Sequence, residues 1–365
     1  MIKDAAKTVI FLFTLLGCVT LCRSQDISAL AKKLADQSAG DLQEKLFVHT
    51  DKDFYMSGEL MWFKIYLTNA RTLKPLDLSK VCYVELLSKD NKPVLQAKLA
   101  LLEAMGNGSF QLPYSVNSGN YVLRAYTNWM KNKGADLFFE KPIKIVNALR
   151  QPEWPAATAA AYDLQFFPEG GDLVNGLASR VGFRIVNASG VGVEASGTVV
   201  NNNNETVARF STRRFGMGNF ELKTERGQSY KAVVNTADGA QITQALPTAL
   251  PSGTVMHVQH LTGNKLGVEV DANDGAASVA MIVQSQQQQP VALSKPLQNG
   301  KASFELDAAQ WNRGITRLTV FGAGGKPVCE RLVFSKPEVL PLRLQTDAPG
   351  YGTRKKVTIE LGSAR

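Results

Sequence analysis

Few residues in this 365-residue chain have the types and spacing that catalysis or metal binding requires. The histidines are His49, His257 and His260, and the last two are three residues apart in a strand-like pattern. A spacing of three on a strand puts two side chains on opposite faces, and no cysteine or carboxylate cluster completes a ligand set. No serine stands in a Gly-x-Ser-x-Gly turn. The sequence therefore predicts a chain without enzymatic activity, metal or cofactor.

Aromatic residues at turns are the better candidates for recognition. Phe166, Phe167 and Glu169 belong to the segment Phe-Phe-Pro-Glu-Gly-Gly, which brings adjacent rings to a turn. Tyr126 and Trp129 are spaced so that they could form a stacking platform for a glycan or a peptide. Plainer interpretations are a core anchor at a domain entrance for the first group, and closure of a sandwich end for the second. These five residues are the predicted binding surface.

The first 24 residues are typical of a secretory signal, since Lys3 and Lys7 precede an apolar run over 9–19. Cleavage after Ser24 is one interpretation. The sequence Leu-Leu-Gly-Cys that ends at Cys18 is also similar to a bacterial lipobox, which would leave an acylated cysteine. We therefore expect export by one of these two routes. No later segment reaches the length of an apolar transmembrane helix.

The number of cysteines and the distribution of charge limit the cellular compartments and the classes of partner that the chain fits. Cleavage after Ser24 leaves Cys82 and Cys329, each inside an apolar strand pattern, so both are predicted to be buried thiols. A secreted animal protein of this size would usually carry disulfides, which favours a bacterial envelope. The formal net charge is +9, but the basic residues are scattered among acids and do not interleave with aromatic residues along one stripe. Nucleic-acid binding is therefore not expected.

A glycine-flanked strand of the form Gly-x-Gly-x-Phe-x-Leu occurs twice, at 106–112 and 216–222, and a looser copy stands at 300–306. Copies at this spacing indicate repeated units of roughly 85 to 110 residues, the size of a β-sandwich. Residues 26–46 have helical periodicity, and the later segments alternate apolar and polar residues. The predicted fold class is all-β, with tandem antiparallel β-sandwiches of macroglobulin-like, immunoglobulin-like or fibronectin-like type after a signal peptide and a short N-terminal helix.

Proline-rich segments and the repeats together give the expected domain organisation. The chain divides into a signal peptide at 1–24, an N-terminal helix and linker at 25–44, sandwiches at 45–148, 162–247 and 252–337, a linker at 149–161, and the start of a fourth sandwich at 338–365. In the last segment, Thr346-Asp347 and Tyr351 repeat the spacing of Thr50-Asp51 and Tyr55. About 25 residues cannot close a sandwich, so we expect the chain to be part of a longer protein.

The segment 48–63 resembles the opening strands of the macroglobulin-like domains of alpha-macroglobulins. It is more similar to bacterial envelope proteins that carry such domains ahead of a TonB-dependent-receptor plug. Further matches follow in order at 83–86, 123–130, 166–171 and 330–334. Asp53 and Ser57 stand where prolines are common in the family. Alpha-macroglobulins form a thioester with a Cys-x-Glu-Gln motif, and the segment Cys-Glu-Arg at 329–331 lacks its glutamine.

The expected function is that of a non-catalytic exported scaffold or binding protein in the periplasm, outer membrane or cell surface of a Gram-negative bacterium. The resemblance implies the N-terminal part of a larger outer-membrane-associated protein that captures or transports a substrate. The alternative is a protease-binding alpha-macroglobulin-like inhibitor that lacks a thioester in this segment. Expected partners are an outer-membrane or periplasmic protein, or a peptide or glycan. Membrane association would come through a partner, a lipidated Cys18 or a further C-terminal domain.

Overall fold

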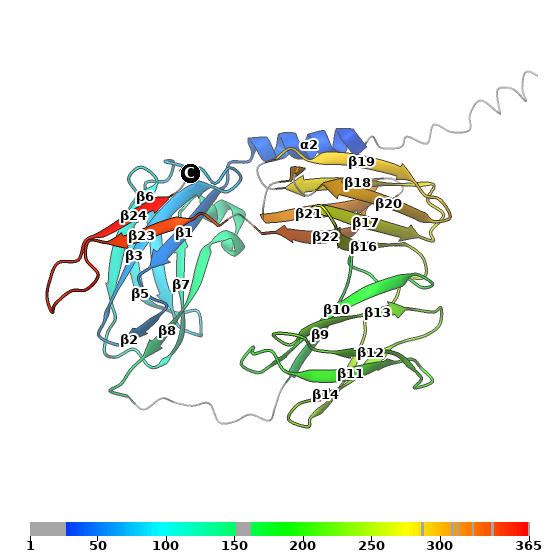
Figure 1. Ribbon diagram of the computed structural model, residues 1–365, viewed down its shortest axis with the longest axis horizontal. Helices are drawn as coiled ribbons and strands as arrows, with labels where there is room; N and C mark the ends of the chain where they lie inside the picture. Colours follow the sequence, from blue (N-terminus) through cyan, green and yellow to red (C-terminus); the bar gives the residue numbers. More distant parts are fainter. Residues whose placement is uncertain are drawn as a thin grey trace, which may run out of the picture.

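The computed structural model describes residues 27–363, apart from 151–161, 286–287, 308–309, 312–313, 323–324 and 337–338. The signal peptide predicted over 1–24, the lipidation site at Cys18 and most of the linker predicted over 149–161 lie outside the described residues. Three β-sandwiches, here called units 1, 2 and 3, follow one another along the chain (Figure 1).

Unit 1 consists of a three-stranded and a five-stranded sheet. The first has the order β1 (Glu44–Thr50), β3 (Leu60–Asn69), β6 (Met105–Gln111). The second has the order β2 (Phe54–Met56), β8 (Phe139–Val146), β7 (Gly119–Tyr126), β4 (Val81–Leu87), β5 (Pro93–Ala100). Two short 3₁₀ helices, η1 (Met130–Lys133) and η2 (Ala135–Leu137), connect β7 to β8. Pairing is antiparallel except between β2 and β8, which run parallel.

Units 2 and 3 each pair a three-stranded sheet with a four-stranded one. Unit 2 contains β9 (Tyr162–Pro168), β10 (Ala178–Asn187) and β13 (Met217–Lys223), opposite β11 (Ala195–Val200), β12 (Thr206–Ser211), β14 (Lys231–Thr236) and β15 (Gln241–Ala245). Unit 3 contains β16 (Thr254–Leu261), β17 (Lys265–Ala272) and β20 (Lys301–Asp307), opposite β18 (Ser278–Ser285), β19 (Val291–Pro296), β21 (Gly314–Phe321) and β22 (Pro327–Ser335). A further hairpin pairs β23 (Leu342–Thr346) with β24 (Ile359–Ser363).

Each unit has its own apolar core between its two sheets. The cores form because strand residues alternate between the inside and the solvent, as in β1, whose exposed Lys45, Phe47 and His49 separate buried positions. The predicted all-β fold class, with antiparallel sandwiches in tandem, is confirmed. Cys82 and Cys329 are free and buried, as predicted, and burial raises the pKa of each thiol to about 12.

The three copies of the repeated glycine motif occupy the same position in their sheets, and each places a small residue opposite a larger one. Its copies form β6, β13 and β20, each of which is the edge strand beside the central strand of a three-stranded sheet. In the first two copies a glycine faces a phenylalanine, and a Cβ added there would lie 2.8 Å or 2.6 Å from the ring. In the third copy alanine faces valine, so a smaller partner leaves room for a methyl group. The facing pairs are Phe63–Gly108, Phe183–Gly218 and Val270–Ala302.

The turn after β1 is fixed by a buried tyrosine. The hydroxyl of Tyr55 donates to Asp51 Oδ1 at 2.6 Å, and the same carboxylate oxygen accepts the backbone N–H of Trp62 at 3.0 Å. Burial and the neighbouring carboxylate raise the pKa of Tyr55 above its ordinary value. The turn between β23 and β24 repeats this arrangement with Tyr351, Asp347 and Thr358.

The N-terminal helix α2 (Ile27–Gly40) packs on the third unit in space, although the first unit follows it in sequence. Its apolar face covers Ile282 on β18 and Phe321 on β21. Figure 1 shows α2 lying over β18 and β19. The helix therefore bridges unit 3 and the start of β1. The part of the chain that the structure describes contains no helix with the length and hydrophobicity of a membrane span.

Candidate functional site

The segment 166–171, singled out for its aromatic residues and glutamate, lies where unit 2 meets unit 3. Gly170 and Gly171 have φ angles of +89° and +124°, which glycine adopts without the penalty of a Cβ. This backbone path brings Gly170 beside β22, where its carbonyl accepts the Glu330 N–H at 3.0 Å. The turn therefore joins the two units by main-chain pairing.

Glu169 is the centre of a charged group between the two units, with only 8% of its surface exposed. Its Oε1 accepts the Nε–H of Arg331 at 3.1 Å. Its Oε2 lies 3.5 Å from His257 Nδ1 and 3.7 Å from Arg180 Nη1. Arg180 comes from unit 2, whereas His257 and Arg331 come from strands β16 and β22 of unit 3. We call these four residues the Glu169 cluster.

The position of His257 favours its charged form. Its Nε2 lies 2.9 Å from the carbonyl oxygen of Ala178, which can only accept a hydrogen bond, so Nε2 carries a proton. A neutral ring would then direct the lone pair of Nδ1 at the Glu169 carboxylate. Protonation at Nδ1 replaces this repulsion with an attraction, and the interaction with Glu169 raises the pKa of His257 despite the opposing effect of burial.

The cations around Glu169 keep it ionised. Burial by itself would raise the pKa of Glu169, but the nearby His257 ring and the charges of Arg180 and Arg331 outweigh that effect and hold the pKa below its usual value. Arg180 is also held by Glu221, whose Oε1 lies 3.1 Å from its Nε. The cluster therefore acts as an electrostatic contact between units, and its carboxylate is committed to protein cations.

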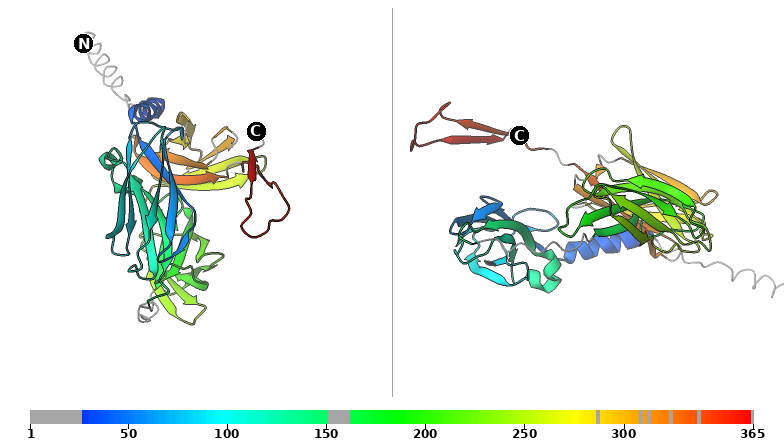
Figure 2. Two further views of the ribbon diagram at one scale, coloured as in Figure 1. Left: turned by 90° about the vertical axis from the view of Figure 1, so that its left-hand side faces the viewer. Right: turned by 90° about the horizontal axis from the view of Figure 1, so that it is seen from below.

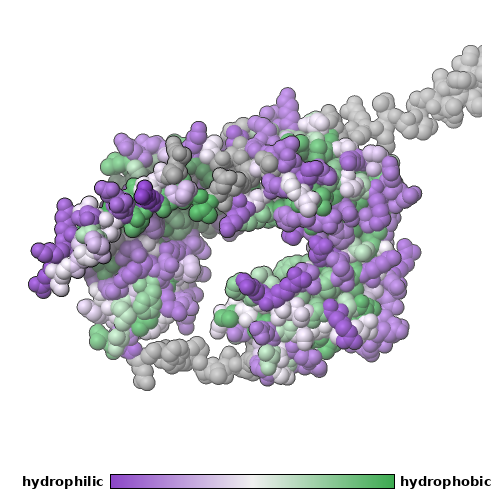
Figure 3. Space-filling view, in the orientation of Figure 1, coloured by the Kyte–Doolittle hydropathy of each residue, from purple (hydrophilic) through white to green (hydrophobic). Residues whose placement is uncertain are grey.

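Main-chain and side-chain hydrogen bonds extend this contact. Leu250 N donates to the carbonyl of Leu173 at 2.8 Å, and Asn175 N donates to the carbonyl of Leu250 at 2.9 Å. Asn273 of unit 3 donates from Nδ2 to the carbonyl of Asn175 at 2.8 Å. The segment 248–251, which lies between the sandwiches predicted over 162–247 and 252–337, is thus bound to unit 2 through Leu250. In Figure 3, units 2 and 3 form a continuous mass while an open gap separates units 1 and 2.

The two phenylalanines of the segment have different environments. Phe166 lies edge-on to Phe210 and Phe220, with ring centroids 6.4 Å and 6.1 Å away, and so packs against the core of unit 2. Phe167 points away from that core and is 52% exposed. Of the segment's predicted site residues, Phe167 is the one that solvent reaches most readily.

Tyr126 and Trp129 lie in unit 1. Tyr126 is stacked with Tyr83 and Phe138, with centroids 5.5 Å and 4.6 Å away. Its hydroxyl donates to Glu85 at 2.9 Å, and burial together with this bond raises its pKa to about 12. Trp129 is 40% exposed and its Nε1–H donates to the carbonyl of Leu42 at 3.0 Å, which fixes the connection from α2 to β1.

The five predicted residues therefore belong to two places and not to one surface. Sequence reasoning missed the partners of Glu169, namely Arg180, His257 and Arg331. His257 was considered only as half of a histidine pair, and its neighbour His260 is exposed and lies outside the cluster. Among the described residues, no group of three or more His, Cys, Asp and Glu side chains could hold a metal ion.

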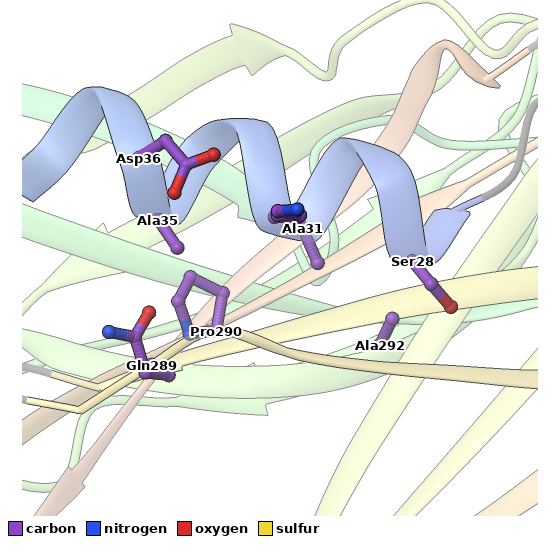
Figure 4. Close-up of a pocket in the computed structure, with 8 residues that line it drawn as sticks. Ser28, Ala31, Ala35, Asp36, Gln289, Pro290 and Ala292 are labelled. Atoms are coloured by element: carbon purple, nitrogen blue, oxygen red, sulfur yellow. The ribbon is translucent and has the colours of Figure 1, made fainter.

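Two shallow pockets lie beside α2, away from the five predicted residues. The first has a volume of about 330 Å³ and lies between the helix and the end of unit 3 that contains Pro290 (Figure 4). Ala31 and Ala35 point toward Pro290 and Ala292 in this view. The second, of about 460 Å³, lies where α2 meets units 1 and 3 and is lined in part by Arg71 and Arg317.

No protein-family model matches the chain, and no curated protein sequence matches it. Solved structures similar to it include an Escherichia coli alpha-2-macroglobulin activated by porcine elastase, with 13% identity and a TM-score of 0.30 over 88% of this chain and 33% of that chain. A dimeric latent PorU from Porphyromonas gingivalis matches with 12% identity and a TM-score of 0.35, over 81% of this chain and 34% of that chain.

A tetra-tandem repeat from the extending region of a large adhesion protein matches with 9% identity and a TM-score of 0.24, over 88% of each chain. The chain spans between a quarter and a third of the length of the bacterial alpha-2-macroglobulins that it matches. The fold assignment depends on the strand pairing and the three cores described above.

Proposed function

We propose that this chain is a non-catalytic, exported scaffold and binding segment of a bacterial cell envelope. The observation that carries the proposal is the Glu169 cluster, which stabilises one placement of unit 2 against unit 3. Neighbouring domains with small polar interfaces move relative to one another by default. A buried carboxylate matched by cations of both units restricts that motion, and a fixed spacing of surfaces is what a scaffold requires.

The finer proposal is that the chain forms the N-terminal part of a larger outer-membrane-associated protein that captures or transports a substrate. The resemblance of segment 48–63 to domains that precede a TonB-dependent-receptor plug supports it. The signal-like segment at 1–24 supports an exported location.

Limited proteolysis of the full chain tests the scaffold. We expect cleavage within 151–161, where the sequence is rich in proline and alanine, and survival of the following block of units 2 and 3 as one fragment. The variant Glu169→Gln should let the protease cut at 247–253 as well. Glu194→Gln, which removes an exposed carboxylate of unit 2, is the matched control and should leave the block intact.

The alternative hypothesis, that the chain is a protease-binding inhibitor, predicts a different result of proteolysis. A single early cut would be followed by a large compaction, measured as a fall in the radius of gyration by small-angle X-ray scattering. Early cleavage between units 2 and 3 in the unmodified chain would also contradict the proposal, because the Glu169 cluster would then not hold the two units together.

A further inference from the structure

The solvent face of the sheet β1-β3-β6 lacks acidic residues. The three strands contain one carboxylate, Glu44, and it points inward, where it accepts hydrogen bonds from Ser79 and Thr127. The residues of the solvent face, called the β1-β3-β6 face below, are Lys45, Phe47, His49, Trp62, Lys64, Tyr66, Met105, Asn107 and Ser109. Figure 2 shows the β23-β24 hairpin clear of this sheet.

Aromatic and basic side chains alternate on this face. Phe47 lies opposite Tyr66, with ring centroids 6.4 Å apart, and Tyr66 lies opposite Met105 on β6. Trp62 is on the same side of β3, four residues before Tyr66, and both Phe47 and Trp62 are 56% exposed. Lys64 lies between the two β3 aromatics, with its ammonium 5.6 Å from the centre of the Tyr66 ring.

The equivalent sheets of units 2 and 3 differ from this sheet because their solvent faces carry carboxylates. In unit 3, Lys265 and Lys301 on the same kind of face pair across strands with Glu305 and Asp271, at 2.5 Å and 3.1 Å. In unit 2, Arg180 pairs with Glu221. Both faces therefore carry carboxylates as well as cations. Unit 1 presents Lys45 and Lys64 with no carboxylate on the face to pair with them, so its positive field is directed at solvent.

We propose that the β1-β3-β6 face binds an anionic glycan, a polysaccharide with carboxylate, sulfate or phosphate groups. This inference rests on the proposed function as a binding scaffold and names its partner class. Exposed aromatic rings present flat apolar surfaces that pack on the C–H faces of sugar rings. Lys45 and Lys64 pair with the anionic groups, and Asn107 and His49 supply hydrogen-bonding groups beside them.

The composition of the face favours a glycan over a protein or a nucleic acid. The cores of protein interfaces are depleted in lysine, whereas Lys64 stands in the middle of this face between two aromatics. Nucleic acids are bound through a dense field of cations along the backbone, and this face has two lysines. An isolated exposed aromatic residue would need no explanation, but a row of them interleaved with unpaired cations marks a contact surface.

Isothermal titration calorimetry on the full chain tests the proposal, with oligogalacturonate and heparin oligosaccharides as anionic probes and cello-oligosaccharide of equal length as the neutral probe. We expect at least one anionic probe to bind, and the neutral probe to bind at least tenfold more weakly. Trp62→Ser and Lys64→Glu should each weaken binding of that probe about tenfold or more, roughly the loss of one good contact. Lys98→Glu is the matched control, because it makes the same charge change on β5 of the other sheet.

Several outcomes would overturn the inference. These are no binding of either anionic probe, equal binding of the neutral probe, equal loss in Lys64→Glu and Lys98→Glu, or binding confined to a single-stranded oligonucleotide or to anionic lipid vesicles. Circular dichroism confirms that each variant is folded. If the probes do not bind while the block of units 2 and 3 survives proteolysis, this inference fails and the scaffold stands. If an anionic probe binds but the protease separates units 2 and 3, the scaffold proposal fails and this inference stands.

Discussion

The substitution Glu169→Gln should weaken the contact between units 2 and 3 and leave unit 1 unchanged. It removes the one carboxylate that Arg180, His257 and Arg331 share, so the three cationic groups remain close together and only Arg180 keeps a paired carboxylate, the exposed Glu221. Removing one partner of a buried ion pair typically costs about 3–5 kcal/mol. The side chains of Arg180 and Arg331 are 39% and 49% exposed, so water solvates part of their charge. The expected loss is therefore about 2–3 kcal/mol.

Differential scanning calorimetry of the full chain measures this loss. For a cooperative block of 150–250 residues, 1 kcal/mol shifts the midpoint by about 2–4 °C, so the transition of units 2 and 3 should fall by roughly 5–10 °C. Glu194→Gln should shift it by less than about 2 °C, as surface substitutions do. A Glu169→Gln shift no larger than that of the control, or an equal shift in unit 1, would refute the account of the cluster.

Three further predictions follow from the packing and the pKa shifts. Gly218→Ala should destabilise unit 2 by about 1–3 kcal/mol, because its Cβ would lie 2.6 Å from both the Phe183 ring and the Ser211 carbonyl oxygen, and urea unfolding should show that Phe183→Val costs less stability in the Gly218→Ala chain than in the unmodified one. The melting difference between the unmodified chain and His257→Gln should be largest below the ordinary histidine pKa of 6.5 and should shrink as pH rises through the raised pKa, since the protonated ring supplies the stabilisation. Cys82 and Cys329 should resist a thiol reagent in the native chain and react after unfolding, because burial raises both pKa values to about 12.

The repeated architecture could be predicted from the sequence because its signals are local. Strands of a sandwich alternate in burial, so β6 and β13 are visible as Gly-x-Gly-x-Phe-x-Leu before any pairing is known. The motif also fixes their place, because a glycine is needed where Phe63 or Phe183 of the neighbouring strand covers the edge strand. The turn around Asp51 and Tyr55 was recognisable for the same reason, since all its hydrogen bonds lie within eleven residues.

The charged contact between units could not be predicted, because its members are far apart in the chain. Arg331 is 162 residues from Glu169, and nothing near either residue indicates the other. The β1-β3-β6 face was missed for a related reason. Along the chain Lys64 is flanked by buried residues, so the linear sequence does not show aromatic and basic residues that interleave on one face. The register that sets Phe47 beside Tyr66 and His49 beside Lys64 produces the alternation.

The distribution of ion pairs separates two roles within one repeated fold. On the three-stranded sheets of units 2 and 3, Arg180, Lys265 and Lys301 pair across strands with carboxylates, and Arg180 also approaches Glu169, so these residues stabilise the units and the contact between them. The same sheet in unit 1 has an equally well packed inner face, yet its lysines have no carboxylate beside them on the outer face. Folding does not require this difference, because the two other units close without it. The absence of carboxylates from this face is the observation on which the proposed glycan binding in unit 1 rests, and the proposed scaffold gives units 2 and 3 the role of its support.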